Sequence, residues 1–427
     1  MSRNQLDRRT FLGASAAAAG GAMAADMTVL DVLQSPAAAA ELKRKQKSVI
    51  LLWLAGGASQ LETFDPKPGR PTGGPYRAIP TVVPGTHISE LMPKMATRMK
   101  HTAIIRSLNT KIADHGGGAD LMSLGRRDEP SLRYPDLGAI VARELGSADS
   151  AVPDYVSFYT QTEGRGSAVG QAGFLGSRYL PMFLTDKSKP DNLERLATLS
   201  DLDHSQRSEL RDHLSKRFAR GRETSAVGSH NQAYARVRGL MASEKLFDIN
   251  QEPQKVRDRY GKTQFGEQAV VARRLVEAGV PFVKLGRAWW DSHGDNFETH
   301  LELVADLDHV MSTLLDDLSE RGLLENTLIV TLSEFGRTPR INSSLGRDHF
   351  ASAWSTTLSG CGIKGGAVYG KTDDDGNKVA DGEISAPELF ATIFEAVGID
   401  PTKEYHAGPR PVPMVDKFAG AVKQVLA

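Results

Sequence analysis

Residues that could do chemistry gather in groups, and each group follows an apolar run of the sequence. Their carboxylates and imidazoles are ligand types for Zn, Mn, Mg or Ca, and their arginines could bind an anionic oxygen group in a bidentate manner. A single Asp–His pair is more often a turn or a helix cap, but groups that recur after successive runs are harder to explain in that way. Four groups follow four runs: residues 56–68, 114–120 and 289–296 follow the first three runs, and residues 333–340 with 346–350 follow the last.

Two features of these groups favour anion binding. Arg337, Arg340 and Arg347 follow the last apolar run and could hold an anionic oxygen group. The glycines at 116–118, if they open a helix, would let backbone amides approach the same anion. These glycines do not form the G-x-G-x-x-G pattern, so a dinucleotide oxidoreductase is a weak hypothesis.

The apolar runs predict the elements that position these groups. Each run is continuous, which indicates a strand buried on both faces of a parallel sheet under helices. Apolar residues recur every three or four positions in the predicted helices, so the alternation of strands and helices predicts a right-handed, doubly wound α/β fold. In such folds the carboxyl ends of the strands border the site. The predicted strands are 49–55, 102–107, 280–285 and 326–332, and the main predicted helices are 267–278 and 301–320.

Two further segments are predicted to lie outside the central sheet. Residues 205–245 are rich in charge and poor in apolar signal, which suggests helices in a cap or insertion over about 190–250. Residues 370–383 contain a run of aspartates that resembles a calcium loop. Lys371 stands where the first EF-hand ligand should be, so a solvated hairpin turn is the better interpretation.

Composition limits the classes of function. The 427 residues contain 52 Lys plus Arg and 52 Asp plus Glu, so the formal charge of zero argues against a nucleic-acid-binding surface over the whole protein. A local basic pocket remains compatible with this balance. The single cysteine, Cys361, forms neither an intramolecular disulfide nor a cysteine-rich metal site.

The N-terminus has the pattern of a twin-arginine export signal. Arg8 and Arg9 precede Thr-Phe-Leu and a small-residue apolar run, which is too short to span a bilayer. A signal over residues 1–40, with the mature chain starting near Glu41, predicts a periplasmic or extracellular protein. Its expected partner is the twin-arginine translocation machinery, and no membrane span should remain after cleavage. An ordinary Sec signal or an uncleaved anchor is the alternative.

Several of these motifs together resemble those of the DUF1501 proteins. The motifs are Gly-Gly-Ala-Ser-Gln-Leu-Glu-Thr-Phe-Asp-Pro-Lys-Pro, Trp-Asp-Ser-His-Gly-Asp-Asn, Glu-Phe-Gly-Arg-Thr-Pro-Arg-Ile-Asn and Gly-Arg-Asp-His-Phe. That family is exported by the twin-arginine route and is grouped with the alkaline phosphatase and sulfatase superfamily. The resemblance covers essentially the whole of residues 41–427. It implies a three-layer α/β/α sandwich with a mostly parallel central sheet, and it implies no established reaction.

The superfamily's functional residues carry over only in part. Its Ser-Asp-His-Gly motif matches residues 333–336, where Glu334 keeps the carboxylate and Phe335 replaces the histidine. Its later metal-ligating histidine matches His349, with Asp348 beside it, and its intermediate Asp and His match Asp291 and His293. The other candidates left open are His300, which could compete with His293, and Glu62 or Asp65, which could replace the acidic residue missing after the first strand.

The nucleophile position of the superfamily falls near His115. Residues 114–120 contain no Ser, Thr or Cys. A covalent seryl or cysteinyl intermediate is therefore not expected. His115 could act as a nucleophile or a general base, or it could be only a capping or loop histidine.

The resemblance and the residues together lead to one leading hypothesis. It is an exported, metal-dependent hydrolase of phosphate or sulfate esters, acting on an anionic small molecule or a polysaccharide ester. The metal would be Zn or Mn rather than Mg or Ca. A non-catalytic binding or assembly protein on the same fold is the alternative. The implied metal-site residues are Asp291, His293, Glu334, Asp348 and His349, and the implied catalytic residues are His115, Arg337 and Arg347.

Overall fold

The computed structural model describes most of the chain after the predicted export signal. The described residues are 46–147, 150, 152–158, 170–184, 188–190, 198–220, 239 and 244–427, and they belong to the unit Arg44–Ala427. The signal at 1–40, the expected mature start at Glu41 and much of the expected insertion over 190–250 lie outside them. None of the helices in the described part is both long enough and apolar enough to cross a bilayer.

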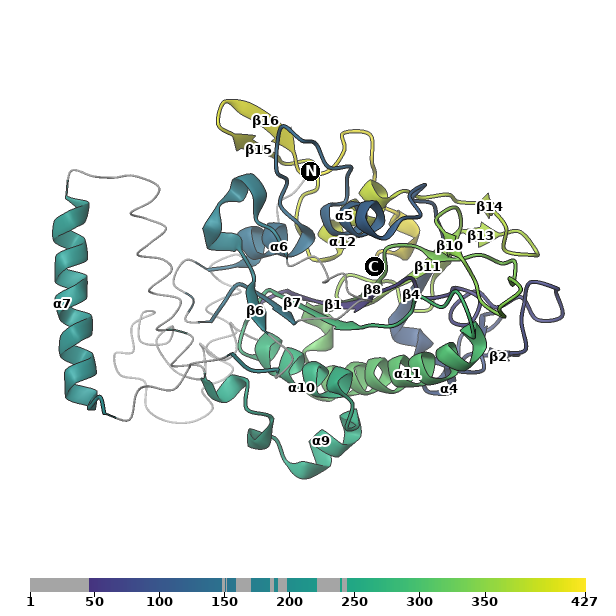
Figure 1. Cartoon of the computed structure of the whole chain (residues 1–427), viewed down its shortest axis with the longest axis horizontal. Coiled ribbons are helices and arrows are strands. Elements are labelled where there is room, and N and C mark those ends of the chain that lie inside the picture. The colour runs from purple at the N-terminus through teal and green to yellow at the C-terminus, as the bar shows by residue number, and fades with distance from the viewer. Residues whose placement is uncertain are drawn as a thin grey trace, which may run out of the picture. The chain divides into compact units, whose positions relative to one another are not determined.

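The described residues contain a mixed, mostly parallel sheet of eight strands (Figure 1). Strand β11 (Trp354–Gly360) is antiparallel to both of its neighbours, β4 (Thr102–Leu108) and β8 (Thr327–Leu332), whereas the other pairs in the sheet are parallel. In spatial order the strands are β12 (Val368–Tyr369), β4 (Thr102–Leu108), β11 (Trp354–Gly360), β8 (Thr327–Leu332), β1 (Ser48–Leu54), β7 (Phe282–Arg287), β5 (Tyr155–Phe158) and β6 (Met182–Leu184).

Strand β1 shows why the sheet needs helices on both faces. It is buried at every residue, and it lies between β7 and β8, with Val49 opposite both Phe282 and Leu328. Its side chains alternate between two apolar cores, since Ile50 and Leu52 belong to one core and Val49 belongs to the other. The continuous apolar run therefore predicted a central strand correctly.

Helices complete the two outer layers. Helices α10 (Gln264–Glu277) and α11 (Asn296–Glu320) supply the core on one face, and α5 (His115–Leu124), α6 (Leu137–Leu145) and α12 (Ala386–Ala396) supply the core on the other face (Figure 1). The predicted α/β/α sandwich is thus confirmed. The predicted helix over 301–320 begins five residues earlier, because its first five residues are polar except for Phe297 and lack the apolar periodicity.

The remaining elements are short. Strands β13 (Lys371–Thr372) and β14 (Val379–Asp381) pair in an antiparallel manner around the aspartate run, which confirms the hairpin predicted over 370–383. Helix α7 (Asp201–Ala219) falls within the expected insertion and has no buried residue. The other helices and strands are β2 (Ala78–Pro80), β3 (His87–Ser89), α4 (Pro93–Ala96), α7 (Asp201–Ala219), α9 (Gln254–Tyr260), β9 (Gly336–Arg337), β10 (His349–Phe350), β13 (Lys371–Thr372), β14 (Val379–Asp381), β15 (Glu404–Ala407) and β16 (Arg410–Pro413). The 3₁₀ turns are Met99–His101, Gly173–Leu175, Ser177–Tyr179, Glu244–Leu246, Ile249–Gln251, Leu324–Asn326 and Lys423–Val425.

Candidate metal centre

The carboxyl ends of parallel strands bring distant polar residues together. Asp291 follows β7, Glu334 follows β8, and His115 begins the helix that follows β4. His349 arrives from β10, which pairs with β9 so that His349 lies opposite Arg337. The predicted grouping at one edge of the sheet is therefore observed.

The carboxylate of Asp291 lies at the centre of the site. His115 Nε2 is 3.0 Å from its Oδ2, and His349 Nε2 is 3.0 Å from its Oδ1. One ligand atom from each of these three residues lies within 4.8 Å of the others, so they could hold a metal ion. We call His115, Asp291 and His349 the His–Asp cluster.

Hydrogen bonds outside the cluster fix how both imidazoles face it. His349 Nδ1 is 2.8 Å from the carbonyl of Ala113, and because a carbonyl only accepts, the ring donates there. His115 Nδ1 lies 3.4 Å from Glu334 Oε1. A proton on each Nδ1 leaves both Nε2 atoms with a lone pair directed at the Asp291 carboxylate. Such an arrangement needs a proton or a cation between the Nε2 atoms and the carboxylate. A metal-ligating histidine usually donates its other ring N–H to an acceptor outside the site, as both of these rings do.

The charge around His115 supports the same conclusion. The hydrogen bond to Glu334 raises the pKa of His115 above its usual value; burial acts in the opposite direction, and the Asp291 carboxylate adds to the increase. Two carboxylates facing one imidazole favour positive charge at this position. A divalent cation between the Nε2 atoms and Asp291 would supply that positive charge in place of the second imidazole proton.

Glu334 supports the cluster and is not part of it. Its two carboxylate oxygens accept from the backbone N–H of Gly56 at 2.9 and 3.1 Å. Gly56 has φ +112°, and a Cβ atom there would lie 2.5 Å from the backbone nitrogen of Asp291. The turn after β1 must consequently carry glycine at position 56, since any side chain there would collide with the loop that carries Asp291.

His293 and Asp348 form a pair on the solvent side of the cluster. His293 Nδ1 is 2.9 Å from Asp348 Oδ1, and its Nε2 is 3.0 Å from His349 Nε2 and 3.2 Å from Asp291 Oδ1. The His293 side chain is 49% exposed, and this contact lowers the pKa of Asp348. Both residues were expected to be ligands, but the structure places Asp348 behind His293 and away from Asp291.

The two arginines expected to hold an anion are buried. Arg337 donates to Asp291 Oδ1 at 2.5 Å and to the carbonyls of Gly56 and Gly57. Arg347 donates to Glu62 at 2.8 Å and to the carbonyls of three loop residues, Thr338, Pro339 and Thr72. Arg337 thus reaches the cluster through Asp291, whereas Arg347 is committed to Glu62 and the loops around it.

The open choice between His293 and His300 is decided by their contacts. His300 is fully buried in α11, where its Nε2 accepts from the Ser59 N–H at 3.0 Å and its Nδ1 donates to the Asn296 carbonyl at 2.9 Å. Burial lowers the pKa of His300 to about 4, so its ring is neutral. His300 is therefore a structural residue, and His293 is the histidine beside the cluster.

The two candidates to replace the acidic residue missing after the first strand are engaged with other side chains. Glu62 is paired with Arg347, and Asp65 binds Lys67 and Thr372. The position after β1 supplies a backbone N–H in place of a carboxylate. Phe335, which stands at the missing histidine, packs its ring 4.3 Å from the His349 ring and 5.1 Å from the His115 ring.

Two supporting contacts were not predicted from the sequence. The Ala113 carbonyl orients His349, and the Asn342 amide donates to the His293 carbonyl at 2.9 Å and to Asp348 at 3.3 Å. The first is a backbone group of a residue without a polar side chain, so no motif marks it. The second comes from the last residue of the motif Glu-Phe-Gly-Arg-Thr-Pro-Arg-Ile-Asn, to which no role was assigned.

Comparisons with known proteins identify a family and a set of distant structures. A family model described as "Protein of unknown function (DUF1501)" matches residues 46–426. No curated protein matches the sequence at a significant level. Among solved structures, Ps i-CgsB in complex with k-i-k-neocarrahexaose is 12% identical, with 89% of this chain and 75% of that chain covered and a TM-score of 0.41.

Two further structures are similar at the same level. A protein in the alkaline phosphatase superfamily from Vibrio parahaemolyticus is 11% identical, covering 90% of this chain and 71% of its own, with a TM-score of 0.39. The C-terminal periplasmic domain of EcEptC from Escherichia coli, in complex with Zn, is 10% identical to this chain. The match covers 89% of this chain and 95% of that domain, with a TM-score of 0.38.

Proposed function

We infer the function of this chain, which belongs to the DUF1501 family, from the geometry of its own site. We propose that it is a metal-dependent hydrolase of phosphate or sulfate esters. The observation that carries the proposal is the convergence of His115, Asp291 and His349 on one point at the carboxyl edge of the sheet. Two imidazoles and one carboxylate form a three-ligand set that leaves coordination positions free.

A divalent metal bound by these three residues would polarise the ester oxygen and lower the pKa of water at a free position. Zn or Mn suits the nitrogen-rich donor set better than Mg or Ca. This role for His115 replaces the proton transfer or nucleophilic attack first expected of it. Residues 114–120 offer no hydroxyl or thiol, so we propose direct attack by water without a covalent intermediate.

The chain's own residues then have distinct tasks. His293 Nε2 faces the cluster while its Nδ1 is held by Asp348, which orients the ring to accept and return a proton. Arg337 fixes the Asp291 carboxylate. Glu334 and the Ala113 carbonyl keep the His115 and His349 rings in place.

One observation favours a second candidate, a non-catalytic binding protein. Phe335 packs against both ligand histidines at the position where the superfamily pattern has a histidine. An imidazole that could ligate a further metal is thereby replaced by an apolar ring. A single metal could then hold an anionic ligand without turnover.

Metal content and turnover together test the proposal. Elemental analysis of protein purified without chelators should give about one Zn or Mn per chain, and His349→Ala should lose most of it. The exposed His87, in β3, provides a matched control, since His87→Ala should keep the metal. Protein without stoichiometric metal would refute the hydrolase proposal. Metal-loaded protein that leaves aryl phosphates, phosphodiesters and aryl sulfates intact would favour the binding protein.

We also propose export by the twin-arginine route, to the periplasm or the exterior. Replacing Arg8 and Arg9 by lysine should leave the precursor in the cytoplasm, because that pathway reads the guanidinium pair and not charge alone. Mass spectrometry of the exported protein should place its first residue close to Glu41. Normal export of the double-lysine variant would argue for a Sec signal.

A further inference from the structure

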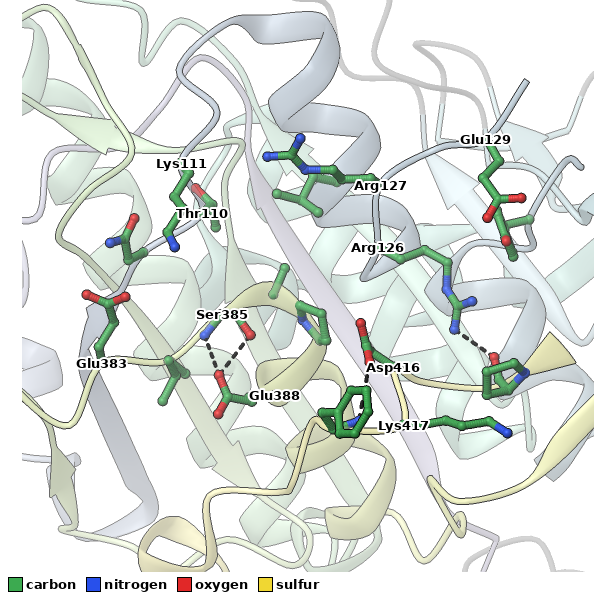
Figure 2. A pocket seen from close by; sticks show the side chains of 18 of the residues that line it. Thr110, Lys111, Arg126, Arg127, Glu129, Glu383, Ser385, Glu388, Asp416 and Lys417 are labelled. Carbon is green, nitrogen blue, oxygen red and sulfur yellow. Dashed lines mark hydrogen bonds between the residues drawn. The ribbon is translucent and has the colours of Figure 1, made fainter. Parts of the chain in front are cut away.

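A cavity lies at the end of helix α5 that is remote from His115 (Figure 2). Its volume is about 690 Å³, which is in the range of small-molecule sites. Its walls come from the loop before α5, the C-terminal end of α5, the first turn of α12 and the chain around and after β16. None of the residues of the His–Asp cluster lines it.

Two cations in this cavity are available to a ligand. Lys111 and Arg127 are exposed on its wall, and among the described residues neither has an ion-pair or hydrogen-bond partner. The other basic side chains of the cavity are engaged: Arg126 donates to the carbonyls of Pro413 and Met414, Arg410 pairs with Glu129, and Lys417 pairs with Glu404. Figure 2 shows Lys111 on the loop before α5 and Arg127 just after that helix.

The cavity also offers acceptors for hydroxyl groups. Asn109 Oδ1 is buried on the wall and has no hydrogen-bond partner in the described part of the chain. A buried acceptor left without a donor is unfavourable, so a ligand hydroxyl that donates there would be favourable. Glu383 and Asp416 supply further acceptor oxygens, while Glu388 is already used in the cap of α12.

An uncovered aromatic ring completes the set. Phe418 lines the cavity and is 97% exposed, although a phenyl ring in solution normally finds apolar cover. A flat face with C–H groups, such as a sugar ring, would cover it. The cavity therefore offers an aromatic ring, acceptors for hydroxyl groups and unpaired cations. These three features match a ligand that carries several hydroxyl groups and a negative charge.

We propose that this cavity binds an anionic sugar. The anionic substituent pairs with Lys111 and Arg127, a hydroxyl donates to Asn109 Oδ1, and the ring lies on Phe418. The site goes beyond the proposed hydrolase function and does not depend on the metal. It shares the loop between β4 and α5 with the cluster, because Lys111 stands two residues before Ala113, whose carbonyl orients His349.

Binding of defined probes to the purified full chain tests this inference. Calorimetry and saturation-transfer NMR would compare glucose 6-sulfate, glucose and inorganic sulfate. Glucose 6-sulfate should bind most tightly. Arg127→Ala should weaken it by about tenfold or more, since a charge-assisted hydrogen bond is lost, and Phe418→Ala by about threefold to tenfold.

The controls separate this cavity from the cluster. Lys364→Ala removes an exposed lysine outside the cavity and should bind as the wild type does, and His349→Ala should keep the sugar while it loses metal. All of the cavity variants change exposed side chains and should unfold at the wild-type temperature. Absence of glucose 6-sulfate binding, equal affinity for inorganic sulfate, wild-type affinity in Arg127→Ala, or loss of sugar binding in His349→Ala would each overturn the proposal.

Discussion

The protein contains two groups that each combine histidine, carboxylate and arginine side chains. Their residues come from neighbouring stretches of the sequence, but the surroundings of the two groups differ. The His–Asp cluster, joined by Arg337, is partly open to solvent. The second group consists of Glu62, His300 and Arg347, which are each 0% exposed; we call it the buried group. The residue types are the same in both.

The two groups differ in whether their polar atoms are already fully engaged by other groups of the protein. In the buried group, both nitrogens of His300 have protein partners, and the Arg347 guanidinium donates to Glu62 and to backbone carbonyls. Burial opposes ionisation of Glu62, yet the Arg347 guanidinium holds the pKa of Glu62 below its usual range. In the cluster, two imidazoles point their remaining nitrogen at one carboxylate. Chemistry is therefore indicated by ligand atoms that converge, and not by the residue types alone.

Arg347→Ala tests the buried side of this comparison and should have the largest effect. The substitution leaves the Glu62 carboxylate buried without its partner, which should lower the free energy of unfolding by about 3–5 kcal/mol. Chemical denaturation measures the change, with the exposed Arg340→Ala as the matched control. A loss below about 1 kcal/mol would mean that the pair is not structural.

The next largest effect should be a loss of stability on acidification, caused by the low pKa of His300. Its pKa is about 4 in the folded protein and about 6.5 when unfolded, so the unfolded state binds more protons between these values. The stability from this depressed pKa is present above pH 6.5 and is lost as the pH falls toward 4. Between pH 7.5 and 4.5 the loss should be about 2.5 kcal/mol. Denaturation of the wild type and of His300→Gln at both pH values isolates it, and an equal pH dependence in the two proteins would contradict the assignment.

Asp348→Asn should have the smallest effect on stability and a clear effect on function. Asp348 is exposed and holds His293 from outside the cluster, so the free energy of unfolding should change by less than about 1 kcal/mol. Metal affinity or ester turnover should fall by about tenfold to a hundredfold, as is usual for outer partners of a metal site. Metal titration and a rate assay check this. Wild-type values in both would remove His293 and Asp348 from the proposed reaction.

The sequence predicted those parts of the fold in which burial leaves an apolar signal. The strands that became β1, β4, β7 and β8 read as continuous apolar runs because helices cover both faces of the sheet. Strand β11 gives no such signal, although it lies between β4 and β8. Apart from Trp354 and Leu358, its buried positions carry hydroxyls, and some of these are satisfied across the sheet, as in the contacts of Thr357 with Thr331 at 2.8 Å and of Ser359 with Thr102 at 2.9 Å.

The candidate site was predicted by residue type better than by role. Asp291, His293 and His349 do meet, since the order of the motifs reflects the order of the strand ends. The phase of α11 decides that His300 faces the core, and the start of α5 decides that His115 faces Asp291. Such geometric relations depend on contacts between residues far apart in the chain, so local spacing does not contain them.

The central place of β1 has a consequence for synthesis of the protein. Its two neighbours in the sheet begin only at Phe282 and Thr327, the latter 279 positions after Ser48 (327 − 48). At typical translation speeds, β1 must wait for tens of seconds before either neighbour emerges from the ribosome. During that time a strand that is apolar from Val49 to Leu54 has both hydrogen-bonding edges unpaired, which is the condition for aggregation. The nascent chain should thus depend on chaperones until its C-terminal third is made.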